Sequence, residues 1–411
     1  MAKSLYICYF GINEPLVQTQ VLPYLRELLK DGHQITLLTF EPNNIDRDCV
    51  EAARAICGDG IEWHWLRYHK RLSVLATLWD VLCGAWFVRR FIARENPEIL
   101  HARVHVPALM GAIARMLSRH EPKLLFDIRG FMPEEYTDAG IWPEGGVVYR
   151  LVKRVERWLM KEADGFVVLT ETAREILFPE SCQTGRDKLG RPVEVIPCCV
   201  DMERFETATV ESRNAVRDEL GIGTRPVAVY VGAFGGWYLT KETAELFGAM
   251  RERDPETFAM ILTQSEREMI EPLLITKGFG EADYFIGRVP SSDIPRYLGA
   301  ADIAVSFIKP CYSKIASSPT KNAEYLACGL PIIANAGVGD VDVLIVENGV
   351  GAMVKKFSTD DYLEALSHVD RLSDISDKCR ETARREFDLE TIGGSRYRKL
   401  YASLLQSEDQ V

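Results

Sequence analysis

The sequence lacks the features that mark a secreted or membrane-spanning protein. None of its ten cysteines stands in CxxC or CxxH spacing, so no zinc ligand set is recognisable. The apolar stretch at the N-terminus is short and is interrupted by Glu14 and Pro15, which predicts that no signal peptide is present. No uninterrupted apolar run reaches the roughly 18 residues that a spanning helix needs. We therefore expect a cytoplasmic protein whose cysteines stay reduced.

Four common catalytic motifs are also missing. The sequence has no GxGxxG after its first apolar segment, no GxxxxGK[ST], no GxSxG and no HExxH. A simple dehydrogenase, a P-loop NTPase, a serine hydrolase and a zinc protease therefore lose support. Negative charge also outweighs positive charge, since 60 Asp and Glu against 49 Lys and Arg give a formal net charge of -11. Nucleic acid is not expected as a partner, because its binding depends on neutralising phosphates.

What the sequence does contain is a repeated alternation of short apolar segments and amphipathic segments. The first kind predicts buried parallel strands, and the second predicts helices. The predicted strands are 5–10, 35–40, 99–101, 124–128, 165–169, 193–197, 227–232, 258–262, 284–286, 303–307 and 331–334. The predicted helices are 17–30, 74–95, 108–119, 147–163, 240–253, 267–277, 291–300 (with a serine cap) and 321–328.

This alternation starts afresh in the second half of the chain. With 411 residues, the chain is too long for one compact core. We expect an α/β protein with two doubly wound, Rossmann-like domains. The polar, charged stretch 197–225 separates them, which gives a first domain over 1–200 and a second domain from 201 to 383.

The most informative segment of the second domain is 317–334. A Ser-Ser-Pro sequence precedes a helical stretch there, and free N–H groups at a helix start attract phosphate. Lys321 stands in the first turn, where the helix dipole disfavours it unless an anion binds. Glu324 lies one turn further, and its carboxylate suits the two hydroxyls of a ribose. The alternative is an ordinary capped helix with a solvated lysine and glutamate.

This segment resembles the donor-site segment of retaining GT-B glycosyltransferases of family four, in their bacterial polysaccharide-type branch. Residues 318–325 match a Ser-Pro-x-Lys-x-x-Glu-Tyr form, and 327–331 match the turn that leads into a strand. The first glutamate of the family pattern falls at Ala316. In the glycine loop 230–238, Trp237 and Tyr238 take the place of the usual basic residue. Further matching segments are 32–36, 195–205, 287–289 and 300–302.

The resemblance implies a GT-B fold with the two domains facing across a cleft. It also implies that 384–411 cross back and complete the first domain. The implied reaction moves a sugar from a UDP-, GDP- or CMP-linked donor to a glycan or lipid-linked glycan acceptor, with retention. Neither a metal nor another cofactor is expected. Asp340-Val341-Asp342, although it mimics a metal-binding DxD sequence, is expected to be a loop acid pair.

Candidate site residues follow from these segments and from the expected strand ends, where open α/β sheets bind ligands. The donor-binding candidates are Gly11, Gly235, Gly236, Trp237, Arg288, Ser318, Thr320, Lys321 and Glu324. The catalytic candidates are Asp127, Arg129, His105 and Lys321, and the acceptor-binding candidates are His101, Arg103 and Glu134. Plain structural roles stay open for several of them. The two histidines could be core groups, Asp127 and Arg129 could form a structural ion pair, and Gly11 could belong to an ordinary turn.

A basic and aromatic stretch predicts one more property. Residues 67–71, followed by Trp79, Trp86 and the arginines at 89 and 90, could rest on an anionic membrane at the inner face of the cytoplasmic membrane. The alternative is a core helix with solvated basic ends. Two other functions also stay open. One is a GT-B nucleotide-sugar epimerase or phosphorylase, and the other is a non-catalytic nucleotide-sugar-binding subunit, which the loss at Ala316 favours.

Overall fold

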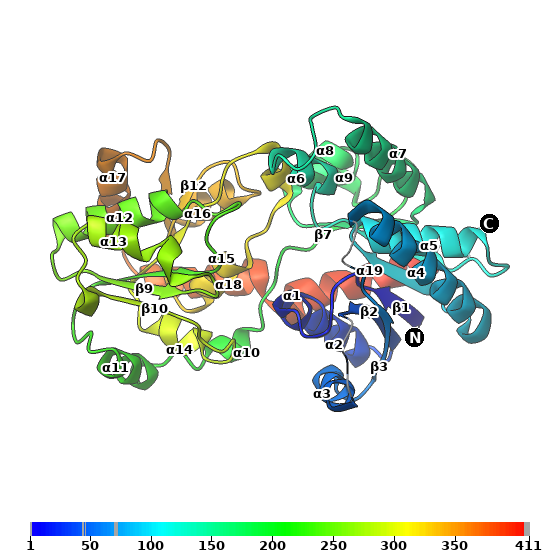
Figure 1. Ribbon diagram of the computed structural model, residues 1–411, viewed down its shortest axis with the longest axis horizontal. Helices are drawn as coiled ribbons and strands as arrows, with labels where there is room; N and C mark the ends of the chain where they lie inside the picture. Colours follow the sequence, from blue (N-terminus) through cyan, green and yellow to red (C-terminus); the bar gives the residue numbers. More distant parts are fainter. Residues whose placement is uncertain (1, 43–44, 46, 70–72, 407–411) are drawn as a thin grey trace. The chain divides into compact units, whose positions relative to one another are not determined.

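The computed structural model describes residues 2–42, 45, 47–69 and 73–406 and divides into two compact units (Figure 1). Unit 1 comprises Met1–Pro197 together with Leu389–Val411, and unit 2 comprises Cys198–Asp388. Each unit has a parallel sheet with helices on its faces, which confirms the predicted α/β, doubly wound architecture. No helix within the described part of the chain combines the length and apolar character that crossing a bilayer requires.

The sheet of unit 1 has the strand order β3-β2-β1-β4-β5-β6-β7, and all of its neighbouring strands are parallel. The strands are β1 (Lys3–Ile7), β2 (Gln34–Glu41), β3 (Ile61–Arg67), β4 (Ile99–Arg103), β5 (Lys123–Asp127), β6 (Gly165–Val168) and β7 (Val193–Val195). The helices are α1 (Pro15–Gln20), α2 (Leu22–Lys30), α3 (Arg47–Cys57), α4 (Ser73–Glu95), α5 (His105–Met116), α6 (Met132–Asp138), α7 (Val147–Glu162), α8 (Glu171–Leu177), α9 (Ser181–Thr184) and α19 (Ser395–Gln406).

The strand order reverses direction at β1, and this places helices on both faces of the sheet. The chain moves one way from β1 to β3 and the other way from β4 to β7. Right-handed crossovers therefore put α2 on one face and α4, α5 and α7 on the other. The C-terminal helix α19 packs against α2 and β7, so the end of the chain completes unit 1.

Two of the differences between unit 1 and the sequence prediction have a clear local cause. The predicted helix 17–30 is two helices, α1 and α2, which meet at Val21. Pro23 explains the break, because its ring nitrogen cannot donate to the carbonyl of Thr19 and its ring crowds that carbonyl. The edge strand β3 was not predicted, because its polar residues alternate with aromatic ones and form no apolar run.

The sheet of unit 2 has the order β10-β9-β8-β11-β12-β13 and is also parallel throughout its named pairs. The strands are β8 (Val227–Val231), β9 (Phe258–Leu262), β10 (Tyr284–Gly287), β11 (Ile303–Ser306), β12 (Ile332–Asn335) and β13 (Gly351–Val354). The helices are α10 (Met202–Phe205), α11 (Val210–Glu219), α12 (Thr240–Arg253), α13 (Glu271–Thr276), α14 (Ile294–Gly299), α15 (Thr320–Ala327), α16 (Val341–Asn348), α17 (Thr359–Asp370) and α18 (Ile375–Phe387).

Two predicted helices of unit 2 are shorter than expected. The stretch 267–277 is a 3₁₀ turn, Arg267–Met269, followed by α13, because Pro272 fixes a new helix start. The predicted serine cap of 291–300 is wrong. Helix α14 begins at Ile294 after Asp293, whose side chain makes no capping bond.

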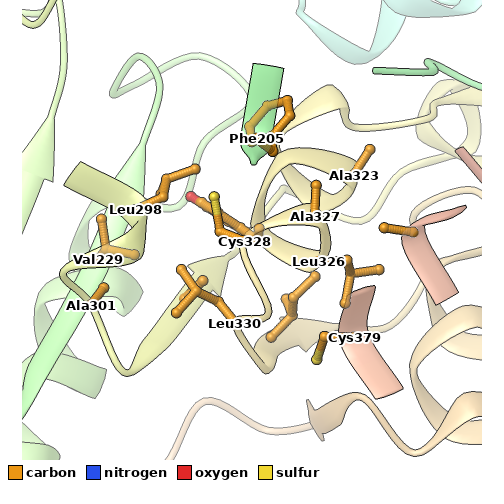
Figure 2. Close-up of a cluster of buried hydrophobic side chains, with 14 of the residues drawn as sticks. Phe205, Val229, Leu298, Ala301, Ala323, Leu326, Ala327, Cys328, Leu330 and Cys379 are labelled. Carbon is orange, nitrogen blue, oxygen red and sulfur yellow. The ribbon is translucent and has the colours of Figure 1, made fainter. Parts of the chain in front are cut away.

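The helix α15 is anchored by the hydrophobic core of unit 2. Leu326, Ala327 and Cys328 point into a buried cluster (Figure 2). Side chains from β8, α10, α14 and α18 meet them there, among them Phe205, Val229, Leu298 and Cys379. Because close-packed cores tolerate little shift, this packing fixes the axis of α15 and the starting position of every side chain on it.

Candidate functional site

Lys321 lies in the first turn of α15 with its side chain only 8% exposed. Its ammonium nitrogen stands 4.2 Å from the ring centre of Tyr230 and 4.4 Å from that of Tyr238. Among the residues that the structure describes, Nζ has no hydrogen-bond partner. The ammonium group of Lys321 is therefore in contact with two tyrosine rings. The sequence prediction did not include these rings as contacts of the lysine.

This environment makes the charged form of Lys321 costly. Burial lowers the pKa of Lys321 from 10.5 to about 7, and the nearby carboxylate of Glu324 opposes that fall only partly. Two cation–π contacts contribute roughly 0.5–2 kcal/mol each, less than a buried ammonium loses with its water. An anion next to Nζ would supply the missing partner. The backbone N–H groups of Thr320 and Lys321, which lie in a first helical turn, would support the same anion.

The glycine loop after β8 is built around this lysine. A Cβ at Gly232, where φ is +133°, would lie 3.0 Å from the ammonium nitrogen. Gly235 and Gly236 also have positive φ, and a Cβ at Gly235 would meet Met269 at 2.9 Å. Trp237 contacts a different lysine, since Nζ of Lys314 lies 4.2 Å from its ring centre. The loop thus brings two aromatic–lysine contacts to the same end of the sheet.

The other donor-binding candidates differ in how closely they are connected to α15. The hydroxyl of Ser318 accepts a hydrogen bond from the Cys198 backbone at 3.1 Å, which ties the helix start to the first residues of unit 2. Glu324 is half-buried, and burial raises its pKa while the charges of Arg204 and Lys321 oppose that rise. Arg288 is exposed after the edge strand β10 and donates to the Gln264 carbonyl at 3.0 Å, so no described contact joins it to α15.

The acid pair at 340 and 342 does not form a loop, so this expectation is wrong. Asp340 precedes the first residue of α16, and Asp342 lies in its first turn. Acidic residues stabilise a helix start through the helix dipole, which gives the pair a structural role. Within the described residues, no three His, Cys, Asp or Glu side chains form a group that could hold a metal ion.

In unit 1, Asp127 is the centre of a buried network at the end of β5. Its side chain is fully buried, and one oxygen accepts from Arg129 Nε and from the Tyr397 hydroxyl, each at 2.9 Å. His101 and Arg103 approach the same oxygen at 3.6 and 3.8 Å. Burial alone would raise the pKa of Asp127, but the charge of Arg129 and the other partners hold it well below its usual range.

This network favours the structural alternative for four of the predicted residues. Burial lowers the pKa of His101, so the ring is neutral, and its Nδ1 lies 3.0 Å from the Tyr401 hydroxyl. Arg129 has a left-handed φ of +56° that points its side chain back over Asp127. The four side chains lie together around Asp127, where Tyr397 and Tyr401 of α19 join them. Nε2 of His101 and Nε of Arg103 have no hydrogen-bond partner among the described residues. Their roles with a substrate stay a prediction.

A second network joins His105 and Glu134, which the sequence placed in separate roles. His105 Nε2 lies 3.0 Å from Glu156, and Lys153 bridges Glu156 to Glu134. The Tyr149 hydroxyl donates to Glu134 at 2.9 Å. Burial would raise the pKa of Glu156, but the contacts of His105 and Lys153 hold it below its usual range. The helix α7 supplies the three partners that sequence reasoning missed, and only their helical spacing hinted at a shared face.

Gly11 has a close neighbour that explains why a glycine stands there. A Cβ at this position would lie 2.7 Å from an oxygen of Glu41, a buried residue at the end of β2. Glu41 also accepts from the Ile12 backbone at 2.7 Å and from the Thr39 hydroxyl at 2.5 Å. The loop after β1 is therefore fastened by Glu41, and a buried carboxylate beside Gly11 disfavours a phosphate at that point.

Comparison with known proteins assigns both units. Residues 17–181 match the model of the glycosyl transferase 4-like domain, and residues 212–386 match that of the glycosyl transferases group 1. The chain belongs to the GT-B glycosyltransferases. A curated relative, the 2-deoxystreptamine glucosyltransferase of Streptomyces kanamyceticus, is 28% identical to this glycosyltransferase over 202 residues. That match covers 47% of this chain and 48% of the relative, so the chain spans about half the length of the curated relative it matches.

Solved glycosyltransferase structures share the fold along the whole chain. A sucrose-phosphate synthase from Thermosynechococcus elongatus superposes with a TM-score of 0.70 and 17% identity, covering 98% of this chain and 100% of that one. HepE of Anabaena, in complex with UDP and glucose, gives a TM-score of 0.66 and 16% identity with the same coverage. At such low identity these likenesses show the GT-B fold and leave the substrates open.

The buried ammonium predicts how the stability of the glycosyltransferase depends on pH. The pKa of Lys321 is lower in the folded chain than in the unfolded one, so the unfolded state binds the proton more tightly. The free energy of unfolding should therefore rise as pH increases from about 7 towards 10.5. Lys321→Met removes this cost and should raise the melting temperature at pH 6.5 by about 2–4 °C, with a smaller gain at pH 9.5.

Thermal melts of the two proteins at both pH values measure this effect. The control is Lys241→Met on α12, whose side chain is exposed and whose removal should shift neither melt. A wild-type protein that is more stable than Lys321→Met at pH 6.5 would show that the ammonium is already well paired.

Proposed function

We propose that this glycosyltransferase moves a sugar from a nucleotide-activated donor, bound by unit 2, to a glycan or lipid-linked glycan acceptor. We further propose that transfer proceeds with retention and without a metal ion. The observation that carries the donor site is the buried, unpartnered ammonium of Lys321 at the start of α15. A group that is costly to bury alone and lies at a helix start is suited to a phosphate.

The chemistry of such a transfer needs positive charge at this place. When the bond between the anomeric carbon and the phosphate oxygen breaks, negative charge grows on the departing nucleotide. Lys321 and the first N–H groups of α15 would stabilise that charge, and the rings of Tyr230 and Tyr238 exclude water so that the attraction is strong. Glu324, one turn along and half-buried, would accept the hydrogen bonds of the ribose hydroxyls.

Two of the similar proteins suggest which donor and which kind of acceptor to test first. HepE of Anabaena is described in complex with UDP and glucose, which supports UDP-glucose as the first donor to test. The name of the curated relative, 2-deoxystreptamine glucosyltransferase, supports a glucosyl donor and a polyhydroxylated ring as acceptor. GDP- and CMP-linked sugars are the next donors in the series.

A membrane contact of the acceptor domain is the second part of the proposal. The helix α4 has exposed apolar side chains at spacings of three and four residues, which lie on one face. These are Val74, Leu75, Leu78, Trp79, Leu82 and Trp86. Arginines 89, 90 and 94 follow on the same helix, while Lys70 and Arg71 of the predicted basic stretch lie outside the described residues. Apolar and basic groups together suit an anionic bilayer at the inner face of the cytoplasmic membrane.

A thermal-shift series with UDP-, GDP-, ADP- and CMP-sugars tests the donor site. One nucleotide should raise the melting temperature of the wild-type protein by several degrees, because a ligand that binds only the folded state stabilises it. Lys321→Ala should abolish this shift and slow donor turnover about 100-fold or more, which is typical for loss of one group that stabilises a leaving-group charge.

Donor turnover is measured with radiolabelled sugar nucleotide, with and without acceptor. Lys241→Ala serves as the control, because it removes an exposed lysine of the same unit. Turnover by Lys321→Ala at the wild-type rate with saturating donor would refute the phosphate site. Binding without any turnover by the wild-type protein would instead favour a non-catalytic sugar-nucleotide-binding subunit.

Vesicle co-sedimentation tests the membrane contact. The wild-type protein should sediment with phosphatidylcholine vesicles that contain phosphatidylglycerol, less so in high salt, and poorly with phosphatidylcholine alone. The double variant Leu78→Ser/Leu82→Ser should lose most of this binding. Leu189→Ser removes an equally exposed leucine elsewhere in unit 1 and should bind as the wild type does. Equal sedimentation of all three proteins would refute the contact.

A further inference from the structure

A cluster of polar side chains lies at the carboxyl edge of the unit 1 sheet, outside the two networks described above. Tyr9 follows β1 by two residues, and His69 follows β3 by two residues. Because these strands are parallel, both residues lie at the same edge, where open α/β sheets bind their ligands. Asp80 joins them from α4, so three separate elements meet in this cluster.

Asp80 organises the cluster. Its side chain is fully buried, and it accepts from the Tyr9 hydroxyl at 2.6 Å and from the His69 backbone N–H at 3.1 Å. The second carboxylate oxygen lies 2.5 Å from Nδ1 of the His69 ring. Burial and the bond to Asp80 raise the pKa of Tyr9, so its hydroxyl stays a donor. The buried carboxylate of Asp80 is thus in contact with hydrogen-bond donors of both Tyr9 and His69.

The contact with Asp80 determines which ring nitrogen of His69 remains available to bind a ligand. An ionised carboxylate can only accept hydrogen bonds, so Nδ1 of His69 must carry the proton. In the neutral ring Nε2 then holds a free lone pair and is a hydrogen-bond acceptor. The side chain of His69 keeps 33% of its surface exposed, so the ring is partly open to solvent.

Further aromatic rings pack against this cluster at Tyr9. Tyr68 packs edge-on against Tyr9 with ring centres 5.2 Å apart, and Tyr136 on α6 is near enough to Tyr68 to influence its pKa. Tyr136 stacks on Trp142 with centres 4.3 Å apart while 40% of it stays exposed. Sugars present apolar C–H faces and hydroxyl groups together, and binding sites match them with aromatic rings and a few placed polar groups.

We propose that this cluster is a subsite for the sugar or cyclitol acceptor. Nε2 of His69 accepts the hydrogen bond of an acceptor hydroxyl, and the rings of Tyr68 and Tyr136 contact the apolar face of the acceptor. Asp80 and Tyr9 are positioning residues that fix the ring of His69. This proposal rests on the proposed function and assigns the acceptor hydroxyl to His69, in place of the histidines buried at 101 and 105.

Acceptor kinetics test the proposal with UDP-glucose as donor, and with 2-deoxystreptamine and a set of p-nitrophenyl glycosides as acceptors. His69→Ala should raise the acceptor KM about five- to tenfold, as expected for one lost hydrogen bond to an uncharged group. Donor hydrolysis without acceptor should keep the wild-type rate. His64→Ala changes another partly exposed histidine, which lies within β3 itself; it is the matched control and should change neither quantity.

The outcomes separate this proposal from the proposed function. Loss of both donor hydrolysis and transfer in His69→Ala, or an acceptor KM equal to that of His64→Ala, would overturn the acceptor subsite. Wild-type protein that neither binds nor turns over any donor would instead refute the proposed function.

The tautomer of His69 gives a test that needs no turnover. In protein labelled with ¹⁵N-histidine, the resonances of His69 are identified as those missing from His69→Gln. The neutral ring should carry its proton on Nδ1, and the Nε2 resonance should shift when 2-deoxystreptamine is added. A ring protonated on Nε2 alone would overturn the proposal, and so would an Nε2 resonance that no acceptor of the set moves. Asp80→Asn, if it folds, should mix the two tautomers and raise the acceptor KM, whereas a purely structural pair would leave that KM unchanged.

Discussion

The burial of one ammonium group governs the design of unit 2. The hydrophobic core fixes α15, and α15 in turn places Lys321 between two tyrosine rings with no described hydrogen-bond partner. Replacing this lysine by an apolar residue would be the cheaper solution for folding alone. A stability cost at a helix start is instead what a binding site for an anion requires, because the ligand supplies the interaction that the fold withholds. The glycine loop after β8, where Gly232 leaves room for the ammonium, completes this arrangement.

In unit 1, unlike at the start of α15, the two buried networks bring charged groups next to partners of opposite charge. Asp127 and His105 each contact charged or polar partners within the fold. Such networks position the strand ends and the C-terminal helix α19, although Nε2 of His101, Nε of Arg103 and Nδ1 of His105 have no hydrogen-bond partner among the described residues. The cluster near β1 and β3 differs, because the side chain of His69 is held by Asp80 and stays partly exposed.

Much of this architecture can be predicted from the sequence, and each missing prediction has a specific physical reason. Strands buried on both faces appear in the sequence as apolar runs, and the bounds predicted for strand 258–262 agree with β9 to the residue. The bounds predicted for helix 240–253 likewise agree with α12. The edge strand β3 is polar on one side and gave no such signal. Lys321 is indicated by its unusual place in a first helical turn together with the family resemblance, and its role with a donor stays a prediction. Tyr230 could not be connected to it from sequence, because the contact depends on how β8 packs beside α15. Likewise, the pairing of His69 with Asp80 depends on how a strand end meets a helix, which no local pattern encodes.

The central claim is that the buried amine of Lys321, with a pKa of about 7, is largely uncharged in the free protein at pH 8 and is protonated when a nucleotide diphosphate binds. Isothermal titration of UDP at pH 8 in two buffers of different ionisation enthalpy measures the protons exchanged. With the pKa of Lys321 at about 7, binding should take up close to one proton per UDP, seen as a heat that differs between the buffers. Binding of UDP with equal heats in both buffers would mean that Lys321 is charged beforehand, or that the diphosphate binds elsewhere, and would contradict this account.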